Sequence, residues 1–546
     1  MFVPSDRFDV HRKPPRQQTT STSVAYTLVG GFVVVYNLLS LVVKERLYMN
    51  EVALGTGFGV LLGPHVLGIF DPRSWTHVTD TLTREIMRIV LATGLFAIGV
   101  ELPKRYMADH ARSLLIMVVP TMAFGWFVSA AFIHLLFPKL DFVSSLVISA
   151  CLTPTDPIIS AAVIGGRFAV KNVPLSIRHL LVAESASNDG LAYPFLSISI
   201  YLTTEASRAT AFEKWVVIGW IYQVILGTVL GAVIGYIFSR LLKLAHRKGF
   251  LDRESYIAQY VALALFTVGA TKSLGNDDLL AAFAAGSAIS WDGHFNTQTE
   301  DDAFSSILDL VLNCACFIYI GAWLPFDKFN IPELGVTPWR LVLLMLVILA
   351  LRRIPSLLVL FKFLPEVSNW REALFCGHFG PIGVGAVFIS TLAQSHLEAP
   401  RDPPSSQQDV LATALQPIVS FIVLGSILTH GLSIPFFSMG RRTLTISRSL
   451  VTDHPDWLQW ARRMPSHDDA ERIATPSANA TVVIEESQRK KVLRIEQVCT
   501  DFSPSYLVLS ESFHLKGPPS STRQSTVVIE EHIGVAVPEQ AVLRDS

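Results

Sequence analysis

The sequence predicts an all-α polytopic membrane protein with about thirteen transmembrane helices and a water-facing C-terminal tail. Only 16% of the 546 residues are charged and 50% are hydrophobic, whereas soluble proteins carry about a quarter charged residues. The charges are also unevenly placed, because 27 of the 89 charged side chains lie in residues 441–546. Apolar runs of about 20 residues, the length that crosses a bilayer, recur before that point.

The composition divides the chain into three parts. Residues 1–23 are a polar N-terminal segment, residues 24–440 are a transmembrane domain with its core around 142–202 and 338–437, and residues 441–546 are a tail. The tail is rich in Ser, Thr and Pro, which predicts that it is cytoplasmic and largely disordered. A net charge of −1 gives no indication of a nucleic-acid partner. The five cysteines include no CxxC pair, so neither a disulfide framework nor a resident metal is expected.

The apolar runs give thirteen candidate membrane spans in chain order. They are 24–43, 51–70, 85–102, 114–137, 142–163, 179–202, 215–244, 256–274, 279–290, 303–324, 338–363, 371–395 and 411–437. The run at 279–290 is short for a span, which leaves the count at twelve or thirteen. Lys and Arg concentrate after odd-numbered spans, so those loops and the tail are expected to be cytoplasmic.

Two spans carry helix-breaking residues near their middle. Span five contains TPTDP at 153–157, and span twelve contains GHFGPIGVG at 377–385. Proline removes a backbone donor and clustered glycine weakens a helix, so both spans are expected to unwind. Unwound backbone at membrane depth is tolerated only where it is buried in protein or lines a cavity. The residues at these breaks are Pro154, Pro157, Gly380, Pro381 and Gly383.

The two breaks occupy matching positions if spans 1–6 and 8–13 are two repeats joined by span seven. Broken helices at corresponding positions of two halves indicate a transporter binding site. Two unrelated proline kinks remain the alternative, because no sequence identity between the halves is visible.

Span six brings two carboxylates, Glu184 and Asp189, into an apolar run. A charged residue at this depth costs roughly 2.5–3.5 kcal/mol. Helical spacing places Ser185 and Asp189 on one face, and Glu184 and Asn188 on the neighbouring face. One helix therefore offers oxygen ligands for a cation beside a second carboxylate.

Glu184 is expected to form a structural ion pair with Arg353, with Arg352 as the alternative. These are the only adjacent arginines inside a long apolar run, and a buried guanidinium needs a carboxylate. Asp189 then remains as the group that exchanges a proton for an alkali cation, which it would bind transiently.

The first break can add oxygen ligands to the same site. Thr155 offers a hydroxyl and Asp156 a carboxylate, although Asp156 also fits the N-cap of a helix that restarts at Pro157. Glu101, at the end of span three, is either a residue of a cytoplasmic funnel or a charge at the membrane interface.

At these motifs the sequence resembles the fungal plasma-membrane sodium/proton antiporter family, of the monovalent cation:proton antiporter 1 type, in the cation/proton antiporter superfamily. The resemblance covers about residues 20–440. It rests on FAIGVELP (96–103), TPTDP (153–157), ESASNDGLAYPF (184–195), DDLLAAFAAGSAISWDGHF (277–295), RRIP (352–355) and GHFGPIGVGAVF (377–388).

The resemblance implies an inverted-repeat antiporter fold in which two unwound helices cross, and a homodimer in the lipid bilayer. It also implies that Asp189 is the essential carrier of cation and proton, that Asn188, Ser185, Thr155 and Asp156 surround it, and that Glu184 pairs with an arginine. Pro154 stands where an alanine is expected, and Ala186-Ser187 where Gly-Cys is expected, which affects the choice among cations.

The expected function is therefore secondary active antiport, not enzyme catalysis, and it needs no cofactor. Sodium, lithium and in some members potassium leave in exchange for H⁺ by alternating access. No GxxxxGK[ST] phosphate loop and no TVGYG-like filter occurs. The alternatives are a monovalent cation channel and a proton-coupled transporter of another small solute.

Overall fold

The computed structural model describes most of the membrane domain and three short segments of the tail. The described residues are 21–40, 42–43, 49–76, 78–164, 169, 173–299, 304–444, 481–487, 490–496 and 525–528. The chain forms two compact units, Met1–Met464 and Pro465–Ser546, and each is described by itself.

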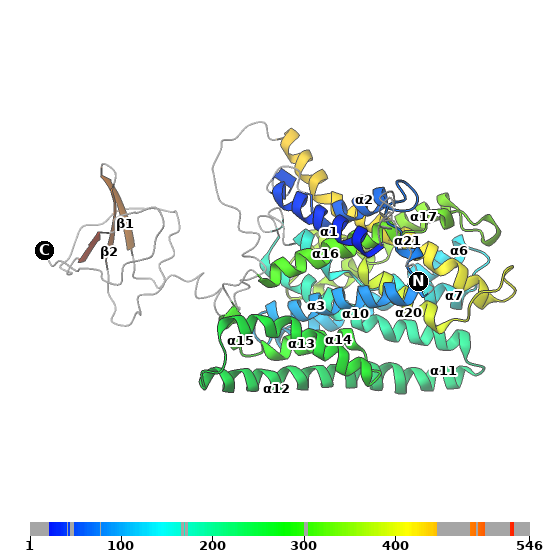
Figure 1. Ribbon diagram of the computed structural model, residues 1–546, viewed down its shortest axis with the longest axis horizontal. Coiled ribbons are helices and arrows are strands. Elements are labelled where there is room, and N and C mark those ends of the chain that lie inside the picture. Colours follow the sequence, from blue (N-terminus) through cyan, green and yellow to red (C-terminus); the bar gives the residue numbers. More distant parts are fainter. Residues whose placement is uncertain are drawn as a thin grey trace, which may run out of the picture. The chain divides into compact units, whose positions relative to one another are not determined.

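The described part of the first unit is helical (Figure 1). Its first helices are α1 (Ser21–Leu38), α2 (Glu51–Leu62), α3 (Thr79–Glu101), α4 (Tyr106–Asp109), α5 (Ala111–Val118), α6 (Pro120–Leu136), α7 (Phe142–Cys151), α8 (Pro157–Ile164) and α10 (Leu175–Thr204). The helices that follow are α11 (Arg208–Lys214), the π-helix η3 (Trp215–Leu226), α12 (Gly227–Arg247), α13 (Arg253–Ser273), α14 (Asp278–Ile289), α15 (His294–Thr299), α16 (Phe304–Trp323), α17 (Pro338–Leu351), α18 (Ile354–Leu360), α19 (Trp370–His378), α20 (Val384–His396) and α21 (Gln407–Leu444). Short 3₁₀ turns are η2 (Pro72–Ser74), η4 (Phe326–Phe329), η5 (Pro332–Leu334) and η6 (Phe361–Phe363).

Every range predicted to be a membrane span contains helix. The second is shorter than predicted, because α2 ends at Leu62 ahead of Gly63-Pro64. Span eleven has an interruption that was not predicted, since α17 ends at Leu351 and α18 begins at Ile354. By length and composition, four helical stretches of the described residues can cross a membrane: Ala111–Leu136, Arg208–Arg247, Pro338–Phe363 and Gln407–Ser433.

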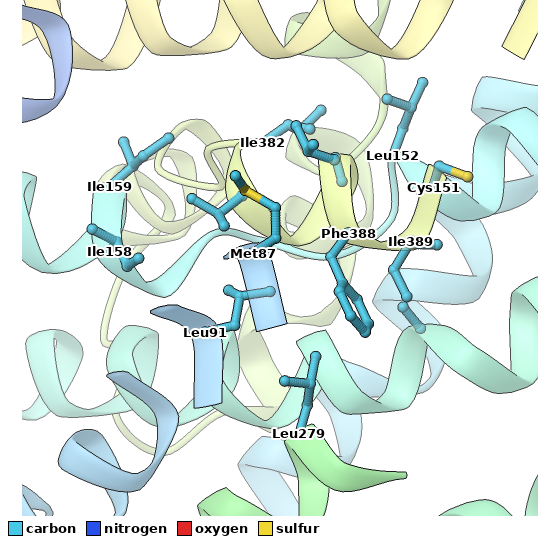
Figure 2. Close-up of a cluster of buried hydrophobic side chains, with 14 of the residues drawn as sticks. Met87, Leu91, Cys151, Leu152, Ile158, Ile159, Leu279, Ile382, Phe388 and Ile389 are labelled. Atoms are coloured by element: carbon cyan, nitrogen blue, oxygen red, sulfur yellow. The ribbon is translucent and has the colours of Figure 1, made fainter. Parts of the chain in front are cut away.

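Helices distant in sequence pack around the two broken spans. α14 packs against both α12 and α3, while α20 packs against α3 and α21. Figure 2 shows apolar side chains of both breaks in one cluster: Leu152 and Ile382 lie with Met87 and Leu91 of α3, and with Leu279 of α14. Apolar burial therefore brings the two breaks to the same place in the domain.

The described residues of the second unit form a small antiparallel sheet. Its strands are β1 (Thr481–Ser487), β2 (Lys490–Glu496) and β3 (Ser525–Val528), in the order β1-β2-β3. The all-α prediction therefore holds for the described membrane domain and not for these tail segments. The rest of the tail and residues 1–20 lie outside the described residues, so the predictions of a disordered tail and a polar N-terminal segment stay predictions.

Candidate ion-binding site

The first break lies between α7 and α8, at residues 152–156. Proline explains its position, because Pro154 has no N–H to continue α7 and Pro157 suits the first turn of α8. The backbone N–H of Thr155 donates to Oδ1 of Asn188 at 3.0 Å. A side chain of α10 thus replaces the hydrogen bond that the helix has lost.

The second break lies between α19 and α20, at residues 379–383. Pro381 stands three residues before α20, just as Pro154 stands three residues before α8. The backbone N–H of Asp156 donates to the carbonyl of Pro381 at 2.8 Å. The two breaks therefore touch, and each supplies a hydrogen-bond partner that the other lacks.

Asp156 joins the N-terminal ends of both restarted helices. Its Oδ1 accepts the backbone N–H of Ile159 in α8 at 2.8 Å, and its Oδ2 accepts the N–H of Val384 in α20. A carboxylate is favoured at a helix N-terminus by the helix dipole and by the free N–H groups. Asp156 thus caps α8, as the N-cap interpretation predicts, and it also caps α20.

Arg352 lies at the C-terminal ends of α7 and α19, whereas Asp156 lies at the N-terminal ends of α8 and α20. Its Nη1 donates to the carbonyls of Leu152, Thr153 and Pro154, the latter two at 3.2 and 3.4 Å. Its Nη2 donates to the carbonyl of Gly380, which follows α19. The guanidinium thus satisfies unpaired carbonyls at both breaks, where the helix dipoles favour a cation.

Arg353 is the arginine that pairs with Glu184. Its Nη2 lies 2.5 Å from Glu184 Oε2, its Nη1 contacts Oε1, and its Nε donates to the carbonyl of Cys376 at 3.0 Å. The amide of Asn188 donates to Glu184 Oε1 at 3.1 Å and to Thr155 Oγ1 at 2.7 Å. This buried network ties α10 to both breaks.

Asp189 differs from the other carboxylates at the site. It is buried, and neither of its oxygens has a hydrogen-bond partner within the described part of the chain. It faces Gly385 at the start of α20, where an added Cβ would collide with its Oδ1. A buried carboxylate with two free oxygens requires a proton or a cation.

The remaining predicted site residues differ in the contacts that they make. The Ser185 hydroxyl donates to the carbonyl of Val182 in its own helix at 3.0 Å. Asn188 uses both its amide and its carbonyl in the contacts with Thr155 and Glu184. Glu101 is the last residue of α3 and lies outside both breaks.

Several supporting residues were not predicted. The sequence suggests Arg352 only as a partner for Glu184 and Gly385 only as part of the motif at the second break, because a close approach across two helices leaves no local pattern. The carboxylates at the start of α14 were noted without a role: Asp277 caps Leu280 with an N–H···Oδ1 distance of 2.9 Å, and Asp278 pairs with Arg88 of α3. In the described residues, no three His, Cys, Asp or Glu side chains converge as a metal centre would require.

Two facing breaks, a carboxylate at their helix N-termini and a second carboxylate beside them thus lie together in the domain. Residues 33–440 match the family described as sodium/hydrogen exchanger, transmembrane. The chain belongs to the sodium/hydrogen exchanger family. The membership confirms the predicted resemblance.

Two of the relatives that this chain matches over most of its length come from yeasts. The chain is 43% identical over 438 residues to a probable Na⁺/H⁺ antiporter of Schizosaccharomyces pombe, covering 78% of this chain and 57% of that one. It is 40% identical over 473 residues to an Na⁺/H⁺ antiporter of Saccharomyces cerevisiae, covering 83% of this chain and 48% of that one. The chain thus spans about half the length of these curated relatives.

A solved structure shares the fold. The sodium proton antiporter MjNhaP1 of Methanocaldococcus jannaschii superposes with a TM-score of 0.57 at 16% identity, covering 76% of this chain and 98% of that chain. The predicted antiporter fold is confirmed by this match.

Proposed function

We propose that this chain exports sodium and lithium, and also potassium, in exchange for protons by alternating access. Asp189 binds either the cation or the proton. The observation that carries the proposal is the pair of free, buried Asp189 oxygens beside carboxylates whose oxygens are already engaged. The names of the fungal relatives support sodium and protons as the exchanged ions.

Competition for one carboxylate is sufficient to couple the two ions. A bound proton neutralises Asp189 and removes the attraction for a cation, whereas a bound cation excludes the proton by charge and space. The Thr155 hydroxyl is a candidate for a further oxygen ligand, because alkali cations prefer hard oxygen donors. Asn188 Oδ1 and the Ser185 hydroxyl oxygen are further candidate ligands, because the former accepts only one N–H and the latter donates to Val182, so both retain lone pairs.

The proposal extends to the setting of the protein. The chain lies in the plasma membrane as a homodimer, with its tail in the cytoplasm. The excess of Lys and Arg in the loops after odd-numbered spans supports this orientation.

The test is transport by the purified protein in proteoliposomes that carry a proton gradient. Adding sodium, lithium or potassium to the wild type, side by side, should drive protons in the opposite direction. Asp189→Asn should abolish this proton movement. Asp327→Asn is the matched control, since Asp327 lies in a turn with a 62% exposed side chain, and it should transport as the wild type does. Exchange that persists in Asp189→Asn would contradict the assignment.

The same vesicles separate the antiporter from its alternatives. An antiporter accumulates sodium against its concentration gradient when the proton gradient is imposed, whereas a channel only lets sodium equilibrate. A proton-coupled transporter of another solute would move protons upon addition of sugars or amino acids and not of alkali cations.

A further inference from the structure

The two breaks have the same layout, counted back from the helix that follows each of them. α8 begins at Pro157 and α20 at Val384, and each break comprises the five residues before that point. The N–H groups of Thr155 and Ile382 therefore stand at the same position, two residues before the helix. Neither group has an intrahelical acceptor there, so each needs one from elsewhere.

A side chain from the next span meets each of these N–H groups. At the first break, Asn188 of α10 accepts the N–H of Thr155 at 3.0 Å. At the second break, Ser426 of α21 accepts the N–H of Ile382 through its hydroxyl oxygen at 2.7 Å. Spans six and thirteen are counterparts in the predicted repeats, so Ser426 is the counterpart of Asn188.

His430 extends this support by one helical turn. Its Nε2 lies 2.9 Å from the carbonyl of His378, the last residue of α19. Its Nδ1 lies 3.2 Å from the Ser426 hydroxyl and 2.9 Å from the Ser426 carbonyl. With a proton on Nε2 the ring donates to the His378 carbonyl, and with a proton on Nδ1 it donates to the Ser426 carbonyl; the Ser426 hydroxyl oxygen accepts from Ile382 in either case. Both side chains are buried.

These contacts hold the backbone that meets the ion site. Ile382 lies between Pro381, whose carbonyl accepts the Asp156 N–H, and Gly383, which precedes the Val384 N–H bound to Asp156. One residue further on, Gly385 faces Asp189. A shift of Ile382 therefore moves the part of α20 against which both carboxylates are placed.

We propose that Ser426 and His430 are positioning residues for cation binding, so that α21 supports the second break as α10 supports the first. This inference rests on the proposed cation/proton exchange. The two residues do not touch the cation. They set the place of α20 relative to Asp189, and through it the affinity of the site.

Three variants and one control test the inference in proteoliposomes. Ser426→Ala removes the acceptor for the Ile382 N–H, and His430→Leu removes the donor to His378. His430→Gln keeps an N–H donor, and Ser420→Ala is the matched control, since Ser420 is buried in α21 with a hydroxyl that has no partner in the described part of the chain.

Ser426→Ala and His430→Leu should each raise the KM for sodium about tenfold, with Vmax within about twofold of the wild type. Ser420→Ala and His430→Gln should keep a KM near that of the wild type. An unchanged KM accompanied only by a lower yield of folded protein would overturn the positioning role. A His430→Gln variant as impaired as His430→Leu would overturn the assigned hydrogen bond to His378.

Amide hydrogen exchange of the purified protein gives a readout that does not need transport. The peptide that contains residues 379–383 should exchange faster in Ser426→Ala than in Ser420→Ala. Equal exchange in the two variants would overturn the inference. A wild type that moves no protons upon sodium addition would instead contradict the proposed function, and the exchange rates would still decide the role of Ser426.

Discussion

The first break and the second break share a layout but contribute different chemistry. The first carries a carboxylate, Asp156, and a hydroxyl, Thr155, whereas the second is built of Phe, Gly, Pro and Ile and contributes only backbone. Asp156 consequently serves both breaks, because its two oxygens accept N–H groups from α8 and from α20. The comparison teaches that the carboxylates of the site come from the first half of the chain, while the second half supplies two arginines and the surface that faces Asp189.

The ion pair between Glu184 and Arg353 tests how strongly the two breaks depend on each other. Glu184 contacts Asn188 on the side of the first break, and Arg353 contacts the Cys376 carbonyl on the side of the second. Glu184→Gln or Arg353→Gln leaves a buried charge without its partner, so each should lower the free energy of unfolding by about 3–5 kcal/mol. Thermal unfolding in detergent measures the loss.

The double variant Glu184→Gln, Arg353→Gln is the control for this prediction. It removes both charges, so it should be more stable than either single variant. Equal losses in all three variants would mean that packing, and not the buried charge, holds the breaks together.

Replacing Asp156 by Asn tests whether one carboxylate caps both restarted helices. Asn keeps one oxygen acceptor and turns the other into an N–H₂ donor that faces an N–H group. The expected loss is about 1–3 kcal/mol of stabilisation at the site, seen as a roughly 10- to 100-fold rise in the KM for sodium. Asp141→Asn is the matched control, because Asp141 caps only α7 through the Ser144 N–H at 2.7 Å. Equal effects of the two substitutions would contradict the double cap.

Gly385→Ala tests the surface that the second half supplies to Asp189. An added Cβ would collide with Asp189 Oδ1, so α20 or the carboxylate must shift. Overpacking of this kind costs about 1–3 kcal/mol, and part of it should appear as weaker sodium binding in the KM. Gly94→Ala in α3 is the control, since a Cβ there meets no atom within 4 Å. If Gly385→Ala and Gly94→Ala have the same KM, the contact between Gly385 and Asp189 does not affect sodium binding.

Much of this arrangement could be predicted because it depends on local chemistry. Pro154 and Pro381 lack an N–H wherever the chain places them, so both breaks follow from the sequence. Glu184 needs a cation because it is charged in an apolar run, and few cations were available. Once Glu184 is paired with an arginine, Asp189 is the carboxylate of span six that is left without a cationic partner.

The remainder depends on contacts between distant residues and leaves no local pattern. Arg352 donates to carbonyls some 200 positions away along the chain, and backbone carbonyls are the same in every sequence. Asn188 and Ser185 are recognisable in the sequence as candidate cation ligands, but their hydrogen bonds to Thr155 and Val182 are visible only in the structure. Ser426 and His430 read as ordinary residues of a membrane helix, since their partners belong to another span.

The contacts of Asp156 also determine which surfaces can slide during transport. Pulling α8 away from α20 would leave the N–H of Ile159 or of Val384 without its acceptor in an apolar interior. Where both breaks meet α3 and α14, the contacts include Leu91 and Leu279, whose aliphatic side chains form no hydrogen bonds (Figure 2). Relative motion therefore costs less free energy along this apolar boundary than between α8 and α20, which Asp156 joins. In the proposed exchange cycle the two broken helices would therefore move as one body, with Asp156 holding them together.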